Sequence, residues 1–152
     1  MGALGEQDRR LPRCVLVDEH DVIIEAVTDL VEELGVDVLG TARTGAEGLD
    51  LLEREAPEFA VIGMTLPDMS GIDLARRRGV RAQETALILH TAARTRRVAD
   101  QALAAGFRAV ARKAVPPTGL LAAVRAVLDG GTYVDPSFDA SDPGAEGGSS
   151  ST

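Results

Sequence analysis

Two hydrophobic patterns alternate along this chain, one typical of strands and one typical of helices. Short continuous apolar runs such as "RCVLV" (13–17) and "FAVIG" (59–63) have the length and β-branched content of buried strands. Residues 21–35 instead place apolar side chains every three or four positions, as on one face of a helix, and end at a capping Gly35. Together the patterns predict strands at 13–17, 36–42, 59–63, 85–91 and 108–113, and helices at 21–35, 44–57, about 72–78, 95–106 and 117–131.

This alternation predicts an α/β fold in which a parallel sheet is covered by helices on both faces. Right-handed crossovers make it a doubly wound three-layer sandwich. The length suggests one domain, which we place at residues 13–130. Residues 1–12 are predicted to be a disordered N-terminal extension, and residues 131–152 a Gly/Ser/Asp-rich linker or tail. Within that tail, Tyr133, Val134 and Phe138 offer apolar side chains that can dock on the domain.

The charge distribution bears on partners and location. The formal net charge is −8, and five acids from Asp129 onward, with no base beside them, leave −3 for the rest of the chain. This is no electrostatic footprint for nucleic acid. No apolar run approaches the length of a membrane span, and the N-terminus lacks a signal-peptide core. We therefore expect a cytoplasmic protein with no membrane contact, and a buried, inert thiol at the single Cys14.

Chemistry-bearing residues follow four of the predicted strands. Asp18 and Glu19 come after the first strand, Gly63 ends the third, and Thr91 and Lys113 end the fourth and fifth. The carboxyl ends of such strands share one edge of the sheet, where ligands bind. Two adjacent acids suit Mg²⁺, and a hydroxyl and an ammonium can receive phosphoryl oxygens. Alternatively, the two acids only complement the dipole of the following helix.

Four motifs, in order and at family-like spacing, carry a resemblance to a known family. "VLVDEHD", "LPDMSG", "LHTA" and "ARKAVPP" make residues 13–130 similar to a response-regulator receiver domain (CheY-like) of two-component signal transduction. "DEH" and "GGTYVDP" look most like the NarL/FixJ branch, whose members usually carry a C-terminal helix-turn-helix of the LuxR type. The resemblance implies a flavodoxin-like (βα)5 fold with sheet order 2-1-3-4-5 and a place in a phosphorelay.

The resemblance also implies roles for single residues. Asp18 and Glu19 match the acidic Mg²⁺ pair, and Thr65 matches the residue whose carbonyl completes that metal site. Thr91 matches the switch hydroxyl, and Lys113, the only lysine of the chain, matches the lysine that contacts the phosphoryl group.

Two working parts of the family pattern are absent. Gly63 falls where the family has its phosphoacceptor aspartate, and Val110 where it usually has a Tyr or Phe that moves with the switch hydroxyl. Glycine has no nucleophile, so phosphorylation at residue 63 is not expected and Mg²⁺ binding is weak at best. Asp68, beyond Pro67 on the following loop, lies too far along to substitute.

The expected function is therefore that of a non-enzymatic, atypical pseudo-receiver, part of a transcription regulator whose C-terminal helix-turn-helix lies outside these residues. Control would come from a protein partner, a ligand or dimerisation. For dimerisation, the resemblance implies either the region 95–131 or helices 21–35 and 117–131. The alternatives are a stand-alone protein-interaction adaptor and a pseudo-receiver that binds a metabolite in the vacated pocket. An enzyme of flavodoxin-like fold is disfavoured because the chain lacks a Gly-rich phosphate loop and a nucleophile elbow.

Other polar residues have simpler explanations. His20 and His90 lack a second soft ligand, so we expect one packed and one exposed histidine rather than a metal pair. The arginine runs 76–78 and 94–97 are expected to be solvated helix faces.

Overall fold

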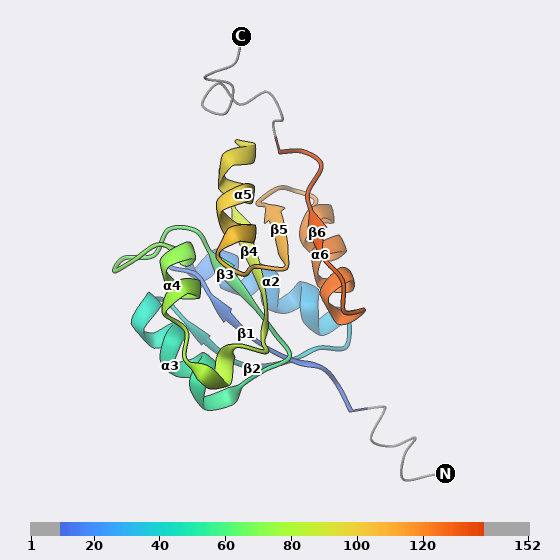
Figure 1. Cartoon of the computed structure of the whole chain (residues 1–152). Coiled ribbons are helices and arrows are strands. Elements are labelled where there is room, and N and C mark those ends of the chain that lie inside the picture. Colours follow the sequence, from blue (N-terminus) through green and yellow to red (C-terminus); the bar gives the residue numbers. More distant parts are fainter. Residues whose placement is uncertain (1–9, 139–152) are drawn as a thin grey trace.

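The computed structural model describes residues 10–138. Its centre is a single parallel sheet in the order β2-β1-β3-β4-β5-β6 (Figure 1). The predicted flavodoxin-like α/β architecture, with strands ordered 2-1-3-4-5, is confirmed, and one further strand is added at the β5 edge. The strands are β1 (Arg13–Val17), β2 (Asp37–Ala42), β3 (Phe59–Gly63), β4 (Ala86–Thr91), β5 (Ala109–Arg112) and β6 (Tyr133–Val134).

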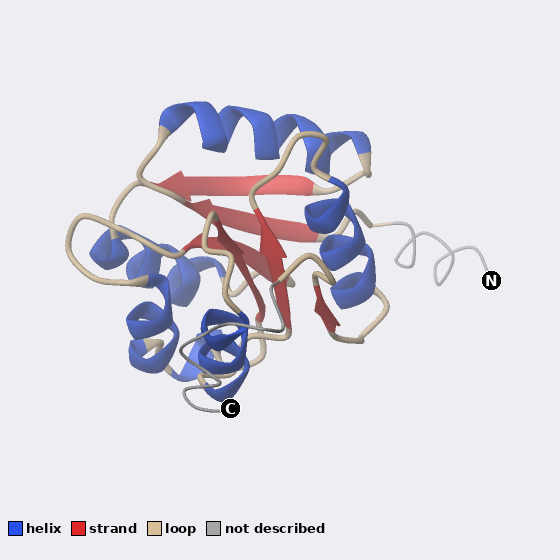
Figure 2. Ribbon diagram, turned by 90° about the horizontal axis from the view of Figure 1, so that it is seen from above, coloured by secondary structure: helices blue, strands red, loops and turns tan. Residues whose placement is uncertain are grey.

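Helices cover both faces of this sheet, so the molecule has three layers (Figure 2). One face carries α2 (Asp21–Glu33) and α6 (Thr118–Leu128). The other carries α3 (Gly45–Glu55), α4 (Gly71–Arg77) and α5 (Arg96–Ala104), with a short 3-10 turn, η1 (Val80–Ala82), before β4.

Each central strand buries side chains on both faces, which explains why its sequence is continuously apolar. On β4, Ile88 joins the core under α2 and α6, whereas its neighbour Leu89 joins the core under α3, α4 and α5. Burial of each such side chain contributes about 1.5–3 kcal/mol through the hydrophobic effect. The two cores hold the strand ends in fixed register, and those ends position the candidate site.

Helix ends follow the predicted signals. The Thr44 hydroxyl accepts a hydrogen bond from the Glu47 N–H at 3.1 Å, one of the two hydrogen bonds of a capping box. Gly35 follows α2 with a φ of +83°, a backbone conformation that side chains rarely adopt. The helices are a few residues shorter than predicted, because the predicted ranges include the capping and turn residues at either end, such as Thr44 and Gly35.

The ordered structure continues past residue 130, where the predicted linker begins. Tyr133 and Val134 form β6, which pairs in parallel with Ala109 and Val110 of β5. The Phe138 side chain is buried in the core under α3, α4 and α5. The docking of these tail residues is thus observed, and only residues 139–152 of the tail and 1–9 of the N-terminal extension lie outside the described residues.

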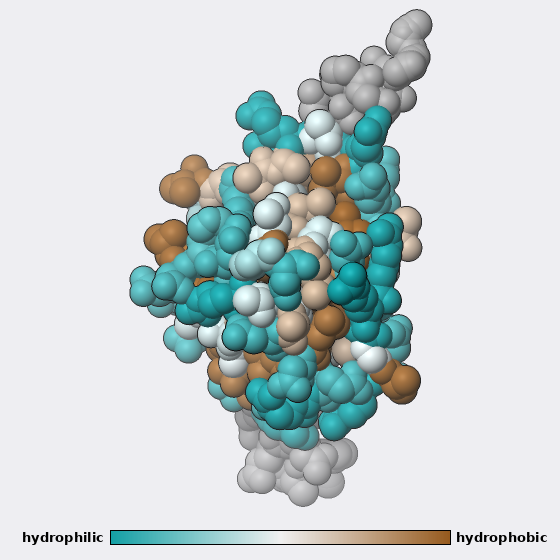
Figure 3. Space-filling view, turned by 90° about the vertical axis from the view of Figure 1, so that its left-hand side faces the viewer, coloured by the Kyte–Doolittle hydropathy of each residue, from teal (hydrophilic) through white to brown (hydrophobic). Residues whose placement is uncertain are grey.

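The surface of the described part is mainly polar, and Figure 3 shows separate hydrophobic side chains scattered among hydrophilic ones on one face. Within residues 10–138, no helix is long and apolar enough to cross a membrane. Five of the six arginines in the two runs are exposed, as expected (Arg76, Arg77, Arg94, Arg96 and Arg97). Arg78 differs: it is half-buried, donates to the Ala75 carbonyl at 2.9 Å, and burial lowers the pKa of its guanidinium.

Candidate functional site

The carboxyl ends of the parallel strands bring a carboxylate and an ammonium together. Asp18, directly after β1, is only 4% exposed. The Lys113 Nζ atom, just beyond β5, lies 2.9 Å from the Asp18 Oδ2 atom. In the absence of an acid at residue 63, the lysine thus pairs with the first of the two acids after β1. It compensates the charge of a carboxylate that would otherwise be buried alone.

Gly63 faces the same carboxylate. A Cβ atom at residue 63 would lie 2.7 Å from Asp18 Oδ2, so any side chain at this position would point toward Asp18. The carboxyl end of β3 is also crowded by α4, because a Cβ at Gly71 would overlap with the Gly63 carbonyl oxygen. The Gly71 N–H donates to the Met64 carbonyl at 2.7 Å and closes the β3–α4 loop.

Hydroxyl groups lie beside this cluster. Thr91 is 2% exposed, and its Oγ1 atom accepts a hydrogen bond from the Ala93 N–H at 3.0 Å. The Thr91 carbonyl accepts from the Lys113 N–H at 2.7 Å, which ties the ends of β4 and β5 together. Thr65 is exposed on the β3–α4 loop. Thr65, Thr91 and Lys113 line one shallow cavity of about 230 Å³.

Val110 lies apart from the rim that Asp18, Gly63, Thr91 and Lys113 form at the strand ends. It is fully buried in the middle of β5, between Leu89 of β4 and Val134 of β6. Its side chain packs in the core under α3, α4 and α5. A residue in this environment is held by packing on every side.

The remaining acids of the region do not complete the site. Both Asp68 oxygens accept hydrogen bonds from the first turn of α3, at 2.7 Å from the Gly45 N–H and 3.0 Å from the Ala46 N–H. These backbone hydrogen bonds lower the pKa of the Asp68 carboxyl. The prediction that Asp68 does not face the pocket is confirmed, because the carboxylate is held at another helix end. Glu19 is half-buried beside Asp18.

The residues present do not fit a divalent cation such as Mg²⁺. Among residues 10–138, no group of three or more His, Cys, Asp or Glu side chains could hold a metal ion. Of the two acids after β1, Asp18 is already engaged by the Lys113 ammonium and by the His20 N–H at 2.9 Å. Mg²⁺ is held by oxygen ligands in octahedral geometry, one or two of them carboxylates, and here the Lys113 ammonium competes with it for Asp18.

The two histidines differ as expected, one exposed and one packed. The His20 Nδ1 atom lies 3.3 Å from Asp18 Oδ1 at the surface. His90, inside β4, is 5% exposed, and burial lowers the pKa of its imidazole to about 4, with a further contribution from the Lys113 charge. Sequence reasoning gave His90 no role, although a histidine within the apolar run "TALILHT" was the available signal.

A parallel α/β sandwich with a carboxylate, a hydroxyl and a lysine at the carboxyl edge of its sheet defines the class of flavodoxin-like signalling domains. Residues 14–125 match the family described as the response regulator receiver domain. The chain belongs to that family.

Solved structures and curated proteins agree with this assignment. The chain is 26% identical to a two-component response regulator of the LuxR family from Aurantimonas sp. SI85-9A1, with a TM-score of 0.78 over 84% of this chain and 91% of that chain. A CheY-like receiver domain protein from Methanospirillum hungatei JF-1 is 29% identical, with a TM-score of 0.69 over 80% and 96% of the two chains. The LuxR-family likeness accords with the predicted NarL/FixJ branch.

Two of the curated relatives are longer proteins that this chain matches in part. The transcriptional activator protein ExaE of Pseudomonas putida is 30% identical over 123 residues, 80% of this chain and 57% of that protein. A protein-glutamate methylesterase/protein-glutamine glutaminase of Halobacterium salinarum is 31% identical over 85 residues, 56% of this chain and 24% of that protein. This chain therefore spans less than three fifths of each of these relatives.

Proposed function

We propose that this chain is a pseudo-receiver: a receiver domain that is not phosphorylated at residue 63 and that serves as the regulatory part of a transcription regulator. The observation that carries the proposal is Gly63, which ends β3 beside Asp18 without a side chain. Phosphoryl transfer to an aspartate requires a carboxylate oxygen in line with the donor phosphorus. Glycine has no such oxygen.

The neighbouring groups support this proposal. In a site built to receive a phosphoryl group, a lysine and a hydroxyl are held ready for its oxygens. Here the Lys113 ammonium is paired with Asp18, and the Thr91 hydroxyl accepts from the Ala93 backbone. Val110, without an aromatic ring, is part of the packed core. The polar groups of the rim therefore satisfy one another within the chain.

A different source of energy must then control the domain. Shifting a two-state protein from about 1:99 to 99:1 requires roughly 5.5 kcal/mol of differential binding. Without an acyl phosphate, that energy comes from a protein partner, a ligand or a second copy of the chain. The domain has no catalytic role in this scheme.

The link to transcription rests on the relatives. ExaE is a transcriptional activator, and this chain corresponds to 57% of its length. The net charge of −8 disfavours direct contact with the phosphates of DNA, so DNA binding belongs to a C-terminal domain outside these residues. Such a protein acts in the cytoplasm. The reading frame of the gene is the simplest check: continuation past Thr152 into a helix-turn-helix supports a transcription regulator, and a stop codon there supports the stand-alone adaptor.

The central test is chemical. Incubation with acetyl phosphate and Mg²⁺, followed by intact-mass measurement under conditions that preserve acyl phosphates, should leave the wild-type chain unchanged. Gly63→Asp should gain one phosphoryl group and bind Mg²⁺, once the end of the Asp18 side chain moves away from the new Cβ. Gly63→Asn is the matched control, since it adds the same volume without a nucleophile. A phosphoryl adduct on the wild-type chain would contradict the proposal.

A further inference from the structure

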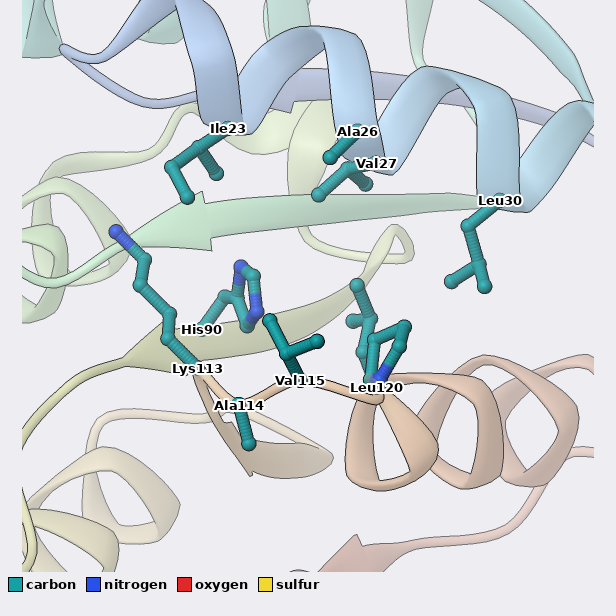
Figure 4. A pocket seen from close by; sticks show the side chains of 10 residues that line it. Ile23, Ala26, Val27, Leu30, His90, Lys113, Ala114, Val115 and Leu120 are labelled. Atoms are coloured by element: carbon teal, nitrogen blue, oxygen red, sulfur yellow. The ribbon is translucent and has the colours of Figure 1, made fainter.

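A cavity of about 340 Å³ lies between α2 and the segment that joins β5 to α6 (Figure 4). This volume is at the lower end of the range for small-molecule sites. Apart from His90 and Lys113, every side chain that lines it is apolar. The α2 wall consists of Ile23, Ala26, Val27 and Leu30, and the opposite wall includes Val115 and Leu120.

The floor of the cavity carries a buried polar group without a partner. His90 is 5% exposed, and within the described part of the chain its Nδ1 atom finds no hydrogen-bond partner. Figure 4 shows the ring standing on β4 with a nitrogen directed toward α2. The residues that flank His90 on the two adjacent strands are Gly63 and Ala111, which are too small to cover it. Leaving such a group unsatisfied costs about 1–3 kcal/mol, which a bound hydrogen-bonding group would recover.

The charge at the end of the cavity is already compensated. The Lys113 stem lines the wall, but its ammonium points away from the ring and pairs with Asp18 at 2.9 Å (Figure 4). The imidazole is neutral near pH 7 because burial lowers its pKa to about 4, so it offers one donor and one acceptor nitrogen. The cavity thus presents an apolar wall and a neutral hydrogen-bonding group, and no free charge.

From this geometry we propose that the cavity between α2 and α6 binds a small uncharged molecule, with an apolar body packed on α2 and one hydrogen-bonding group paired with His90. Neither Asp18 nor Gly63 lines the cavity, and its existence does not depend on whether the domain is phosphorylated. Lys113 connects the cavity with the candidate site, since it forms part of the cavity wall and pairs with Asp18. The almost fully exposed Val115 stands at the mouth, where a ligand would cover it.

The test uses 4-ethylphenol as probe and 4-ethyltoluene as its isostere, in which a methyl group replaces the hydroxyl. Titration of the full chain, followed by two-dimensional NMR, should give saturable shifts at α2 and α6 residues around the cavity. The preference for the phenol over the toluene should fall about fivefold to tenfold in His90→Phe, the size expected for one net buried hydrogen bond. An unchanged preference in His90→Phe would overturn the assignment of His90.

Two substitutions on α2 separate filling of the cavity from general effects. Ala26→Phe projects a ring into the cavity and should weaken phenol binding at least tenfold. Val22→Phe places the same ring on the same helix, at a residue that is 69% exposed and does not line the cavity, and should leave binding unchanged. Absence of saturable shifts in the wild-type chain, or equal losses in both variants, would overturn the proposal. Concentration-dependent self-association that Val115→Asp abolishes, without phenol binding, would assign this face to a second copy instead.

Discussion

The contact between α6 and the segment after β6 provides a quantitative test of how closely these two parts of the chain pack. Asp135 is 8% exposed, and its carboxylate accepts hydrogen bonds from the Arg112 N–H at 3.2 Å, the Ser137 N–H at 2.9 Å and the Ser137 hydroxyl at 2.7 Å. Burial raises the pKa of this carboxyl, but the hydrogen bonds from Ser137 and Arg112 outweigh burial, and the pKa lies below its ordinary value. Gly119 leaves the space that the carboxylate occupies, because a Cβ there would overlap with Asp135 Oδ2.

We therefore predict that the effect of Gly119→Ala on the free energy of unfolding changes sign with the residue at position 135. In the wild-type chain the added methyl group displaces the Asp135 oxygen that accepts from Arg112, and losing a charge-assisted hydrogen bond costs about 1.5–3 kcal/mol. Replacing a helical glycine by alanine returns up to about 1 kcal/mol. The net effect is a destabilisation of about 1–2 kcal/mol. In an Asp135→Ala background the overlap is gone, and the same substitution should stabilise the domain by up to about 1 kcal/mol.

Urea unfolding of the four chains at neutral pH, followed by far-UV circular dichroism, gives the free energies of unfolding and completes a double-mutant cycle. Gly131→Ala is the control for a glycine with open surroundings, since the nearest atom to its added Cβ is the Ala126 carbonyl oxygen at 3.5 Å. A loss of the same size for Gly119→Ala in both backgrounds would refute the reasoning, because it would show that Asp135 does not occupy the space beside Gly119.

Three further predictions concern stability. Gly71→Ala should destabilise the domain by about 1–3 kcal/mol in urea unfolding, because its Cβ would overlap with the Gly63 carbonyl; a neutral effect would contradict this close approach. Thr44→Ala should cost about 1 kcal/mol and Thr95→Ala close to nothing, because only Thr44 caps its helix with a side-chain hydrogen bond; equal losses would argue against the cap. His90 has a folded-state pKa of about 4, so its contribution to stability is complete above its ordinary value of 6.5 and is lost as the pH falls from there toward 4. His90→Phe should flatten the stability curve over that interval in urea unfolding at successive pH values, and an unchanged slope would place the ring in water.

Much of the fold follows from local patterns. The alternation of continuous apolar runs with helical stripes predicts five strands and five helices, and parallel pairing with helices on both faces is the arrangement that buries all of them. The short strand β6 was not predicted. Two residues carry no period, and Tyr133 and Val134 become a strand only because β5 offers an unpaired edge.

The sequence alone determines which residues the candidate site contains. Residue 63 has no side chain, whatever the chain folds into, and the carboxyl ends of successive parallel strands must share one edge. Tertiary structure decided which groups pair there: the Lys113 ammonium with Asp18, and Asp68 with the first turn of α3. It also placed His90 beneath a cavity whose walls come from helices nearly a hundred residues apart in the sequence. Such contacts depend on distances of a few ångströms between distant segments, which packing fixes and sequence periodicity does not encode.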